Sequence, residues 1–210
     1  MSLKVVIAIP SEDQVYTDFA LSLVTMVSMT LQKHSSIIIL SIVNEKSCSI
    51  AQSRCKLVEM AKQQKADAIL FIDDDMVFPA DLLIRLAKHN KDIVGCEAIT
   101  HRIPFKSNCV KISGQSTDGS DHGLEEVYSV GTGIMLIRMP VFDKLTIPYF
   151  DQIYDKEKNR WQGEDVGFCI KAGLAGIKIY VDHDLSKSVD HLGVMPFMIQ
   201  DLKGYQDADK

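Results

Sequence analysis

Three consecutive aspartates, Asp73, Asp74 and Asp75, follow the apolar run 68–72. Carboxylates this close repel one another, because each negative charge disfavours ionisation of the next. A divalent cation relieves that repulsion, and Mg²⁺ or Mn²⁺ prefers carboxylate oxygens while keeping positions open for water and phosphate. On an extended segment Asp73 and Asp75 point to the same side. We therefore expect these two carboxylates to bind Mn²⁺ or Mg²⁺; a solvated acidic turn is the alternative.

A second acidic pair, Glu164 and Asp165, follows Gly163 at the start of a predicted helix. Acidic groups in a first turn are stabilised by the helix dipole, which is the purely structural explanation. The functional explanation is a general base that takes a proton from an attacking hydroxyl. Among the late histidines, His191 is the better candidate to complete a coordination shell around the aspartates, and His183 is the weaker one. We treat four others as surface residues: His34, His89, His101 and His122.

Two further features could hold a substrate. Gly131-Thr132-Gly133 lacks the third glycine of a dinucleotide-binding fingerprint and precedes an apolar strand instead of a helix. It would still allow a substrate to approach the backbone closely, although a simple bend explains it equally well. Arg54, on a predicted helix, suits either a phosphate or the acidic cluster as a bidentate partner, and a solvated side chain is the default.

The elements that would position these residues alternate along the first half of the chain. Apolar strands are predicted at 4–9, 37–43, 68–72 and 93–95, and helices at 15–33, 49–64 and 79–90. Continuous apolar strands separated by helices predict a parallel sheet that is covered on both faces. Ligands bind such sheets beyond the carboxyl ends of the strands, which directs attention to Pro10-Ser11, Asn44-Glu45 and the aspartates.

The second half of the chain does not show the regular alternation of strands and helices. Residues 113–123 and 182–193 are predicted as loops, and the polar stretch 151–163 has no assigned element. Short elements are predicted as strands at 127–130, 134–137 and 177–181, a helical turn at 140–145, and helices at 164–175 and 196–202. No repeat or linker divides the chain, so we expect one domain over 1–210, with 1–100 as a nucleotide-binding half and 101–210 as an acceptor-side half.

Composition narrows the class of protein. The 210 residues are 46% hydrophobic and 24% charged, which is typical of a globular chain. A net charge of −5 argues against a broad basic face for nucleic acid. No apolar run approaches the roughly 20 residues that cross a bilayer, so no transmembrane segment is expected. The odd number of cysteines, five, shows no paired spacing, which favours a reducing cytoplasm. A homo-oligomer is left open.

Taken in order, these features resemble the GT-A type glycosyltransferases, in particular the family-two-like enzymes of bacteria and phages. The resemblance spans about 5–193. It depends on the opening strand that ends in Ile9-Pro10-Ser11, the segment 50–61 around Arg54, the apolar strand with its Asp-x-Asp sequence at 70–79, and the ordered set 131–138, 163–165 and 191–193. The implied fold is a Rossmann-like α/β sandwich with a mostly parallel central sheet.

The resemblance also implies roles for individual residues. The donor would be a nucleotide sugar, such as a UDP- or GDP-sugar, and the acceptor a glycan, lipid or protein. Asp75 would bind Mn²⁺ or Mg²⁺ across the diphosphate, with His191 as a further ligand and Asp73 facing the ribose or a metal-bound water. Asp165 would be the base of an inverting reaction, and Glu164 would contact a sugar. The other implied substrate-binding residues are Pro10, Ser11, Glu12, Arg54, Asp74, Gly131, Thr132 and Gly133.

Two other functions remain open. A haloacid-dehalogenase-like phosphatase also places Asp-x-Asp after an apolar strand, and there Asp73 would form a phospho-aspartate. In that class, however, the sequence usually follows the first strand, whereas here two strand–helix units precede it. The other alternative is a non-catalytic nucleotide- or carbohydrate-binding module on the same scaffold, since a fold alone does not establish activity.

Overall fold

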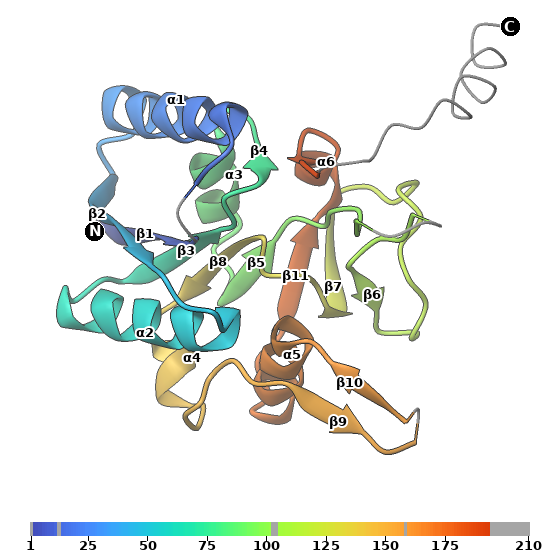
Figure 1. Cartoon of the computed structure of the whole chain (residues 1–210). Coiled ribbons are helices and arrows are strands. Elements are labelled where there is room, and N and C mark those ends of the chain that lie inside the picture. The colour runs from blue at the N-terminus through green and yellow to red at the C-terminus, as the bar shows by residue number, and fades with distance from the viewer. Residues whose placement is uncertain (1, 12–13, 102–104, 158, 194–210) are drawn as a thin grey trace, which may run out of the picture.

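The structure is a computed structural model, and it describes residues 2–11, 14–101, 105–157 and 159–193. Its centre is an eight-stranded sheet in the order β2-β1-β3-β8-β5-β11-β7-β6 (Figure 1). The strands are β1 (Leu3–Pro10), β2 (Ile37–Glu45), β3 (Ala68–Ile72), β5 (Ile93–Gly95), β6 (Val110–Lys111), β7 (Leu124–Ser129), β8 (Ile134–Arg138) and β11 (Ile179–Asp182). The two halves of the chain share this sheet, because β8 lies between β3 and β5.

The sheet is mixed, so the expectation of a mostly parallel sheet is confirmed only in part. β1 pairs in parallel with both β2 and β3, and β11 pairs in parallel with β5. β8 runs antiparallel to β3 and β5, and β7 runs antiparallel to β11 and β6. Apolar runs such as 134–137 predict a buried strand but carry no information on its direction, which explains the error.

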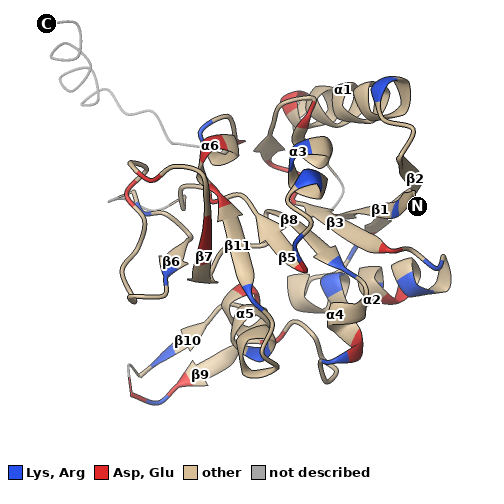
Figure 2. Cartoon of the chain, turned by 180° about the vertical axis from the view of Figure 1, so that it is seen from behind, with Lys and Arg blue, Asp and Glu red and all other residues tan. Residues whose placement is uncertain are grey.

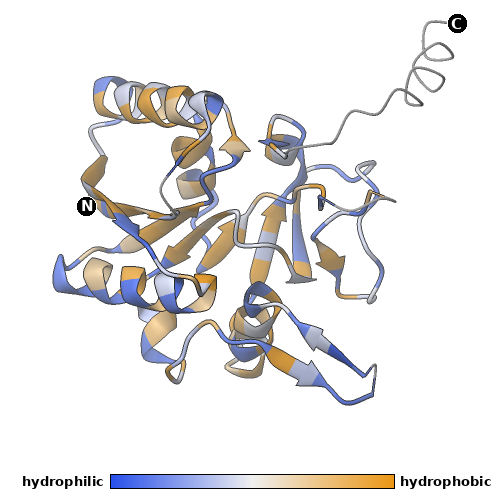
Figure 3. Cartoon of the chain, viewed as in Figure 1, coloured by the Kyte–Doolittle hydropathy of each residue, from blue (hydrophilic) through white to orange (hydrophobic). Residues whose placement is uncertain are grey.

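Helices cover both faces of the sheet (Figure 1). On one face, α1 (Thr17–Lys33) and α3 (Leu82–Lys88) pack against alternate β1 residues such as Val5 and Ile7. On the other, β1 residues Val6 and Ala8 meet side chains of α2 (Ile50–Gln63), α4 (Pro140–Asp143) and α5 (Glu164–Leu174). This two-residue alternation is what a strand buried on both faces requires, and Figure 3 shows the resulting hydrophobic interior of the sheet.

Several small elements were not predicted. The polar stretch 151–163 forms an antiparallel hairpin of β9 (Ile153–Asp155) and β10 (Arg160–Gln162). The expected loop 182–193 contains α6 (His183–Ser186) and β12 (Asp190–His191). β12 pairs antiparallel with β4 (Met76–Val77), which directly follows the aspartates. This last pairing matters most, because it joins two segments more than 110 residues apart at the predicted site.

The remaining predicted elements agree with the structure to within a few residues, and β3 and β5 have the predicted bounds. The predicted terminal helix at 196–202 and the substrate residue Glu12 lie outside the described residues. Within the described part of the chain, no helix combines the length and the apolarity that crossing a membrane demands. Figure 2 shows Lys and Arg on separate elements, α1, α2, α3 and β10 among them.

Candidate functional site

The aspartates lie at the carboxyl edge of the sheet, where β1, β2, β3 and β5 all end. They do not continue as an extended segment. The N–H of Asp73 donates to the carbonyl of Gly133 at 2.9 Å, and the N–H of Met76 donates back to the carbonyl of Asp73 at 3.3 Å, so residues 73–76 form a turn. The side chains of Asp73 and Asp75 consequently meet different partners.

Asp73 belongs to a buried ion-pair network centred on Arg54. The Nη2 group of Arg54 donates to both carboxylate oxygens of Asp73, at 2.9 and 3.0 Å, and its Nη1 group donates to Glu164. Arg54 is only 2% exposed, and its guanidinium lies 5.9 Å from the centre of the Phe150 ring. Burial opposes the charge, but the fields of Asp73 and then Glu164 raise the pKa of Arg54 above its usual value. Arg54 therefore pairs with the acidic cluster, and its two Nη groups are both engaged inside the protein.

Asp75 belongs to a different group, with His101 and His191. Its Oδ2 lies 3.2 Å from Nε2 of His191, whose Nδ1 lies 2.7 Å from the carbonyl of Ile99. The rings of His101 and His191 stack with centroids 3.7 Å apart. One ligand atom from each of the three residues lies within 4.8 Å of the others, which is the spacing of a metal-binding group. Hydrogen bonding to Asp75 raises the pKa of His191.

Two details of this group suit a cation. A carbonyl only accepts, so Nδ1 of His191 carries a hydrogen, and Nε2, which faces the carboxylate of Asp75, becomes a ligand atom when it gives up its proton to an incoming cation. Oδ1 of Asp75 is buried and has no hydrogen-bond partner among the described residues. A buried carboxylate oxygen without a partner is costly, and a cation would satisfy it. We call Asp75, His101 and His191 the open cluster.

Glu164 and Asp165 occupy the first turn of α5, as predicted. Glu164 is bound to Arg54, so it is connected to Asp73 through one guanidinium. Asp165 accepts the N–H of Val166 at 2.7 Å. Burial, and then the negative charge of Glu164, raise the pKa of Asp165 above its usual value. A carboxylate of raised pKa is a stronger base, which is consistent with the role that the sequence suggested.

The glycine segment lies beside Asp73. A Cβ on Gly133 would contact Oδ2 of Asp73 at 3.5 Å, so the backbone passes close to that carboxylate. Gly131 is packed against a side chain of the protein, since a Cβ there would lie 2.2 Å from Nδ2 of Asn108. Thr132 is 1% exposed and its hydroxyl has no partner within the described residues. Of the three, Gly133 is next to the acidic groups.

Pro10 and Ser11 end β1 at the same edge of the sheet. Pro10 pairs with Glu45 at the end of β2, and Asn44 donates its side-chain amide to the hydroxyl of Ser11 and, at 3.3 Å, to the carbonyl of Ile9. Asp74 lies in the turn between Asp73 and Asp75. The residues predicted from the first three strands are thus found along one edge.

A second group of histidine and carboxylates lies further along this edge. His183, 1% exposed, places Nδ1 at 2.7 Å from Glu97 and Nε2 at 2.8 Å from Glu125. Ser107 and Thr117 both donate to the remaining oxygen of Glu97. A neutral imidazole has one donor, so two carboxylate partners require the doubly protonated ring. We call His183, Glu97 and Glu125 the closed cluster.

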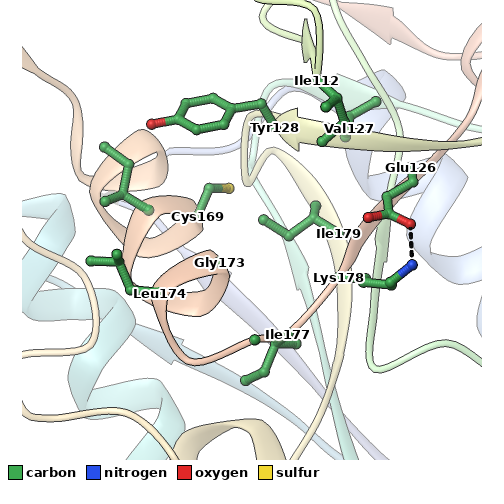
Figure 4. A pocket seen from close by; sticks show the side chains of 12 residues that line it. Ile112, Glu126, Val127, Tyr128, Cys169, Gly173, Leu174, Ile177, Lys178 and Ile179 are labelled. Atoms are coloured by element: carbon green, nitrogen blue, oxygen red, sulfur yellow. Dashed lines mark hydrogen bonds and ion pairs between the residues drawn. The ribbon is translucent and has the colours of Figure 1, made fainter.

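An apolar cavity of about 330 Å³ lies between α5, β7 and β11 (Figure 4). Its walls are mainly aliphatic, and its two charged residues, Glu126 and Lys178, pair with each other at 2.7 Å. Figure 4 also shows Cys169 facing this space. Its Sγ contacts the carbonyl of Val130, and burial raises the pKa of its thiol, so it is a poor nucleophile. This cavity offers no groups for the predicted chemistry.

The sequence analysis missed His101, which was treated as a surface residue. Its signal was its position, a few residues after the strand 93–95, where the rule for the carboxyl edge applies as it does to the aspartates. His89 was also placed at the surface, but its Nε2 lies 2.8 Å from the buried carboxylate of Asp182.

Comparisons with known proteins show the fold alone. No protein-family model matches the chain, and no curated protein matches it. Among solved structures, the chain is similar to the protein A197 from STIV, with a TM-score of 0.54 and 17% identity over 94% of this chain and 98% of A197. The two proteins therefore share a mixed α/β architecture over almost their whole lengths.

Proposed function

We propose that this protein is a metal-dependent glycosyltransferase of GT-A type, which moves a sugar from a nucleoside diphosphate to an acceptor hydroxyl. One observation carries the proposal: the open cluster stands beside the Asp73–Arg54–Glu164 network at the carboxyl edge of the sheet. The sequence resemblance requires a cation and an acidic base in this place, and the fold brings both sets of residues to one edge.

The donor set fits a divalent transition metal. Asp75 would supply a carboxylate oxygen, and His101 and His191 would supply imidazole nitrogens. Imidazole binds Mn²⁺ better than Mg²⁺, which prefers oxygen ligands alone, so we expect Mn²⁺ to be the preferred cation. When bound, the cation supplies positive charge that stabilises the departing diphosphate. Asp73 is not counted as a ligand, because both of its oxygens accept hydrogen bonds from Arg54.

Arg54, Asp73 and Asp165 have the other roles in the proposed reaction. Arg54 is a positioning residue, which fixes the carboxylates of Asp73 and Glu164 relative to each other. Asp73 then faces the donor with a defined orientation. Asp165 takes the proton of the acceptor hydroxyl, a role favoured by its raised pKa. A base that acts from the protein in this way corresponds to an inverting reaction.

The two alternatives are weaker. A phosphatase of haloacid-dehalogenase type needs Asp73 to attack phosphorus, yet Arg54 engages both of its oxygens in a buried pair. A binding module without turnover needs no base, so it gives no role to Asp165, whose pKa is raised by burial and then by the charge of Glu164.

The first experiment is calorimetric titration of UDP and GDP with Mn²⁺, with Mg²⁺ and with a chelator. We expect binding that depends on the metal, tighter with Mn²⁺, and lost in Asp75→Ala. Asp190→Ala is the matched control, because Asp190 is an exposed carboxylate next to His191 in the chain. Equal affinity with and without metal would contradict the proposal.

The second experiment measures release of nucleoside diphosphate from a panel of UDP- and GDP-sugars, since slow hydrolysis of the donor needs no acceptor. We expect Asp165→Asn to lose turnover while it keeps metal-dependent nucleotide binding. Unchanged turnover in this variant would remove Asp165 as the base. Tight binding with no turnover in the unmodified protein would support the binding module.

A further inference from the structure

A cavity of about 710 Å³ lies beside the closed cluster. Its lining includes Glu97 and Ser186, and also Ile99 and Val189. Glu97 is a member of the closed cluster, whereas Ile99 contacts the open one. The volume falls within the range of about 300–1,000 Å³ that is usual for small-molecule sites.

Two lining residues connect the cavity to the open cluster, although the residues of that cluster do not themselves line it. Ile99 lines the cavity, and its carbonyl oxygen lies 2.7 Å from Nδ1 of His191. Val189 lines the cavity and is two residues from His191 in the chain. The cavity therefore adjoins the open cluster through these two residues.

The lining offers exposed apolar side chains to a ligand. Ile99 and Phe105 are large side chains that are 57% and 64% exposed. One polar group of the lining is already paired: both oxygens of Glu97 are bound, by His183 on one side and by Ser107 and Thr117 on the other. Burial opposes ionisation of Glu97, but these hydrogen bonds lower its pKa, so it stays ionised opposite His183. Exposed charged side chains, Lys106, Asp118 and Lys187, also line the cavity. A lining that combines exposed apolar and exposed polar groups favours a ligand that has both an apolar and a polar part.

We propose that this cavity binds the acceptor, and that the acceptor is an amphipathic glycoside, a sugar joined to an apolar or aromatic aglycone. The aglycone packs against Phe105 and Ile99, and the sugar hydroxyl is directed toward the open cluster. The inference depends on the proposed function. In the reaction the acceptor oxygen forms a bond to the anomeric carbon of the donor. The bond from that carbon to the phosphate oxygen breaks, its electron pair leaves with the nucleoside diphosphate, and the hydroxyl proton goes to Asp165.

The test compares phenyl and methyl glycosides of the same sugars, glucose, galactose, mannose and N-acetylglucosamine, because each pair differs only in the aglycone. Binding is measured by calorimetry with Mn²⁺ and the matching nucleoside diphosphate present. We expect the phenyl member of at least one pair to bind at least tenfold more tightly. Phe105→Ala should remove this preference, because it deletes the exposed ring without disturbing the core. Tyr128→Ala is the matched control, since Tyr128 is a half-exposed aromatic residue outside this cavity.

The outcomes separate the inference from the proposed function. Metal-dependent nucleotide binding without any phenyl preference overturns the inference and leaves the glycosyltransferase proposal in place. A phenyl preference that survives in Phe105→Ala also overturns it, because the aglycone would then bind elsewhere. Phenyl glycosides that bind in this cavity to a protein without metal-dependent nucleotide binding overturn the acceptor assignment together with the proposed function. A Phe105-dependent preference that also speeds release of the nucleoside diphosphate supports both.

Discussion

The open and the closed cluster use the same residue types at the same edge of the sheet, yet their surroundings differ. In the closed cluster both nitrogens of His183 face carboxylates, and the ring is 1% exposed. In the open cluster His191 faces a backbone carbonyl and one carboxylate, and its side chain is 23% exposed. A second histidine, His101, stacks on it. Histidine near carboxylates is therefore not in itself a metal site: a cation displaces a ring proton less readily where two carboxylates hold the ring, as in His183, than where one does, as in His191.

The two histidines therefore contribute to different properties of the protein. His183 is held as a cation that neutralises two acidic groups, so its contribution is to stability. His191 can give up its proton and present Nε2 beside an unpartnered oxygen of Asp75, so its contribution is to binding. Measurements of stability and of Mn²⁺ affinity on variants of the two histidines separate these two contributions.

The largest effect is expected on stability, from His183→Ala. This change leaves Glu97 and Glu125 facing each other without the intervening cation, and removing one partner of a buried pair costs about 3 kcal/mol of unfolding free energy. His191→Ala should cost about 1 kcal/mol or less, because its pair with Asp75 is partly exposed, at 23% and 24% of the two side chains. Urea unfolding of both variants without metal measures the difference. Equal losses would show that the two clusters do not differ in this way.

The affinity for Mn²⁺ should depend on the two clusters in the reverse order, with the open cluster having the larger effect. His101→Ala removes one of the three ligands of the open cluster, and we expect the affinity for Mn²⁺ to fall by about tenfold or more. The stability without metal should change little, because the His101 ring is exposed. His122→Ala is the control, since His122 is also an exposed histidine that contacts a carboxylate, Asp184. Calorimetric titration with Mn²⁺ provides the measurement, and the same affinity in both variants would exclude His101 as a ligand.

The closed cluster should also make stability depend on pH. Burial opposes the charged ring, but hydrogen bonds to Glu97 and then Glu125, with the further field of Asp121, raise the pKa of His183 above its ordinary value of 6.5. A raised folded-state pKa gives stability that is fully present below pH 6.5 and is lost as the pH rises through the folded value.

The pH experiment compares wild type with His183→Gln, which keeps a polar side chain but cannot titrate. The difference in unfolding free energy between the two proteins should shrink as the pH rises above 6.5. Subtracting one from the other cancels the contribution of His191, which is present in both. A constant difference across this range would mean that His183 carries no ionisable proton.

Much of the fold could be predicted from the sequence, because it depends on local patterns. Apolar runs such as 68–72 identify buried strands by themselves, and the edge rule drew attention to the end of β3, where the candidate site lies. The direction of β8 could not be predicted, since a strand buried on both faces shows the same apolar run in either direction. That is why the mixed sheet was expected to be mostly parallel.

The site was harder to predict, because long-range contacts assemble it. β4 and β12 have two residues each, which is too short for any periodicity, yet their pairing sets His191 beside Met76 and next to Asp75. The pattern of aspartates suggested Asp73 and Asp75 as equivalent ligands on an extended segment. The turn at 73–76 separates them, so that Asp73 pairs with Arg54 and Asp75 meets the histidines.

The smallest expected effect is on Mn²⁺ affinity when Asp121, beside the closed cluster, is changed, and it tests the difference between the two clusters most directly. Asp121, Glu125 and His183 also have ligand atoms within 4.8 Å of one another, so distance alone would allow a second cation there. Both nitrogens of His183 already point at carboxylates, however, and a cation would have to displace a proton that two negative groups hold. Asp121 also pairs through Oδ1 with Lys111, which brings a positive charge close to the same position.

We therefore expect one Mn²⁺ per chain, and a change of less than twofold in its affinity in Asp121→Asn. Titration calorimetry gives both the stoichiometry and the affinity, and Asp75→Asn serves as the positive counterpart because it alters the open cluster by the same chemical change. A second bound Mn²⁺ that disappears in Asp121→Asn would show that a cation can displace the proton of His183. The two clusters would then differ in affinity rather than in kind, since the imidazole in each could become a ligand.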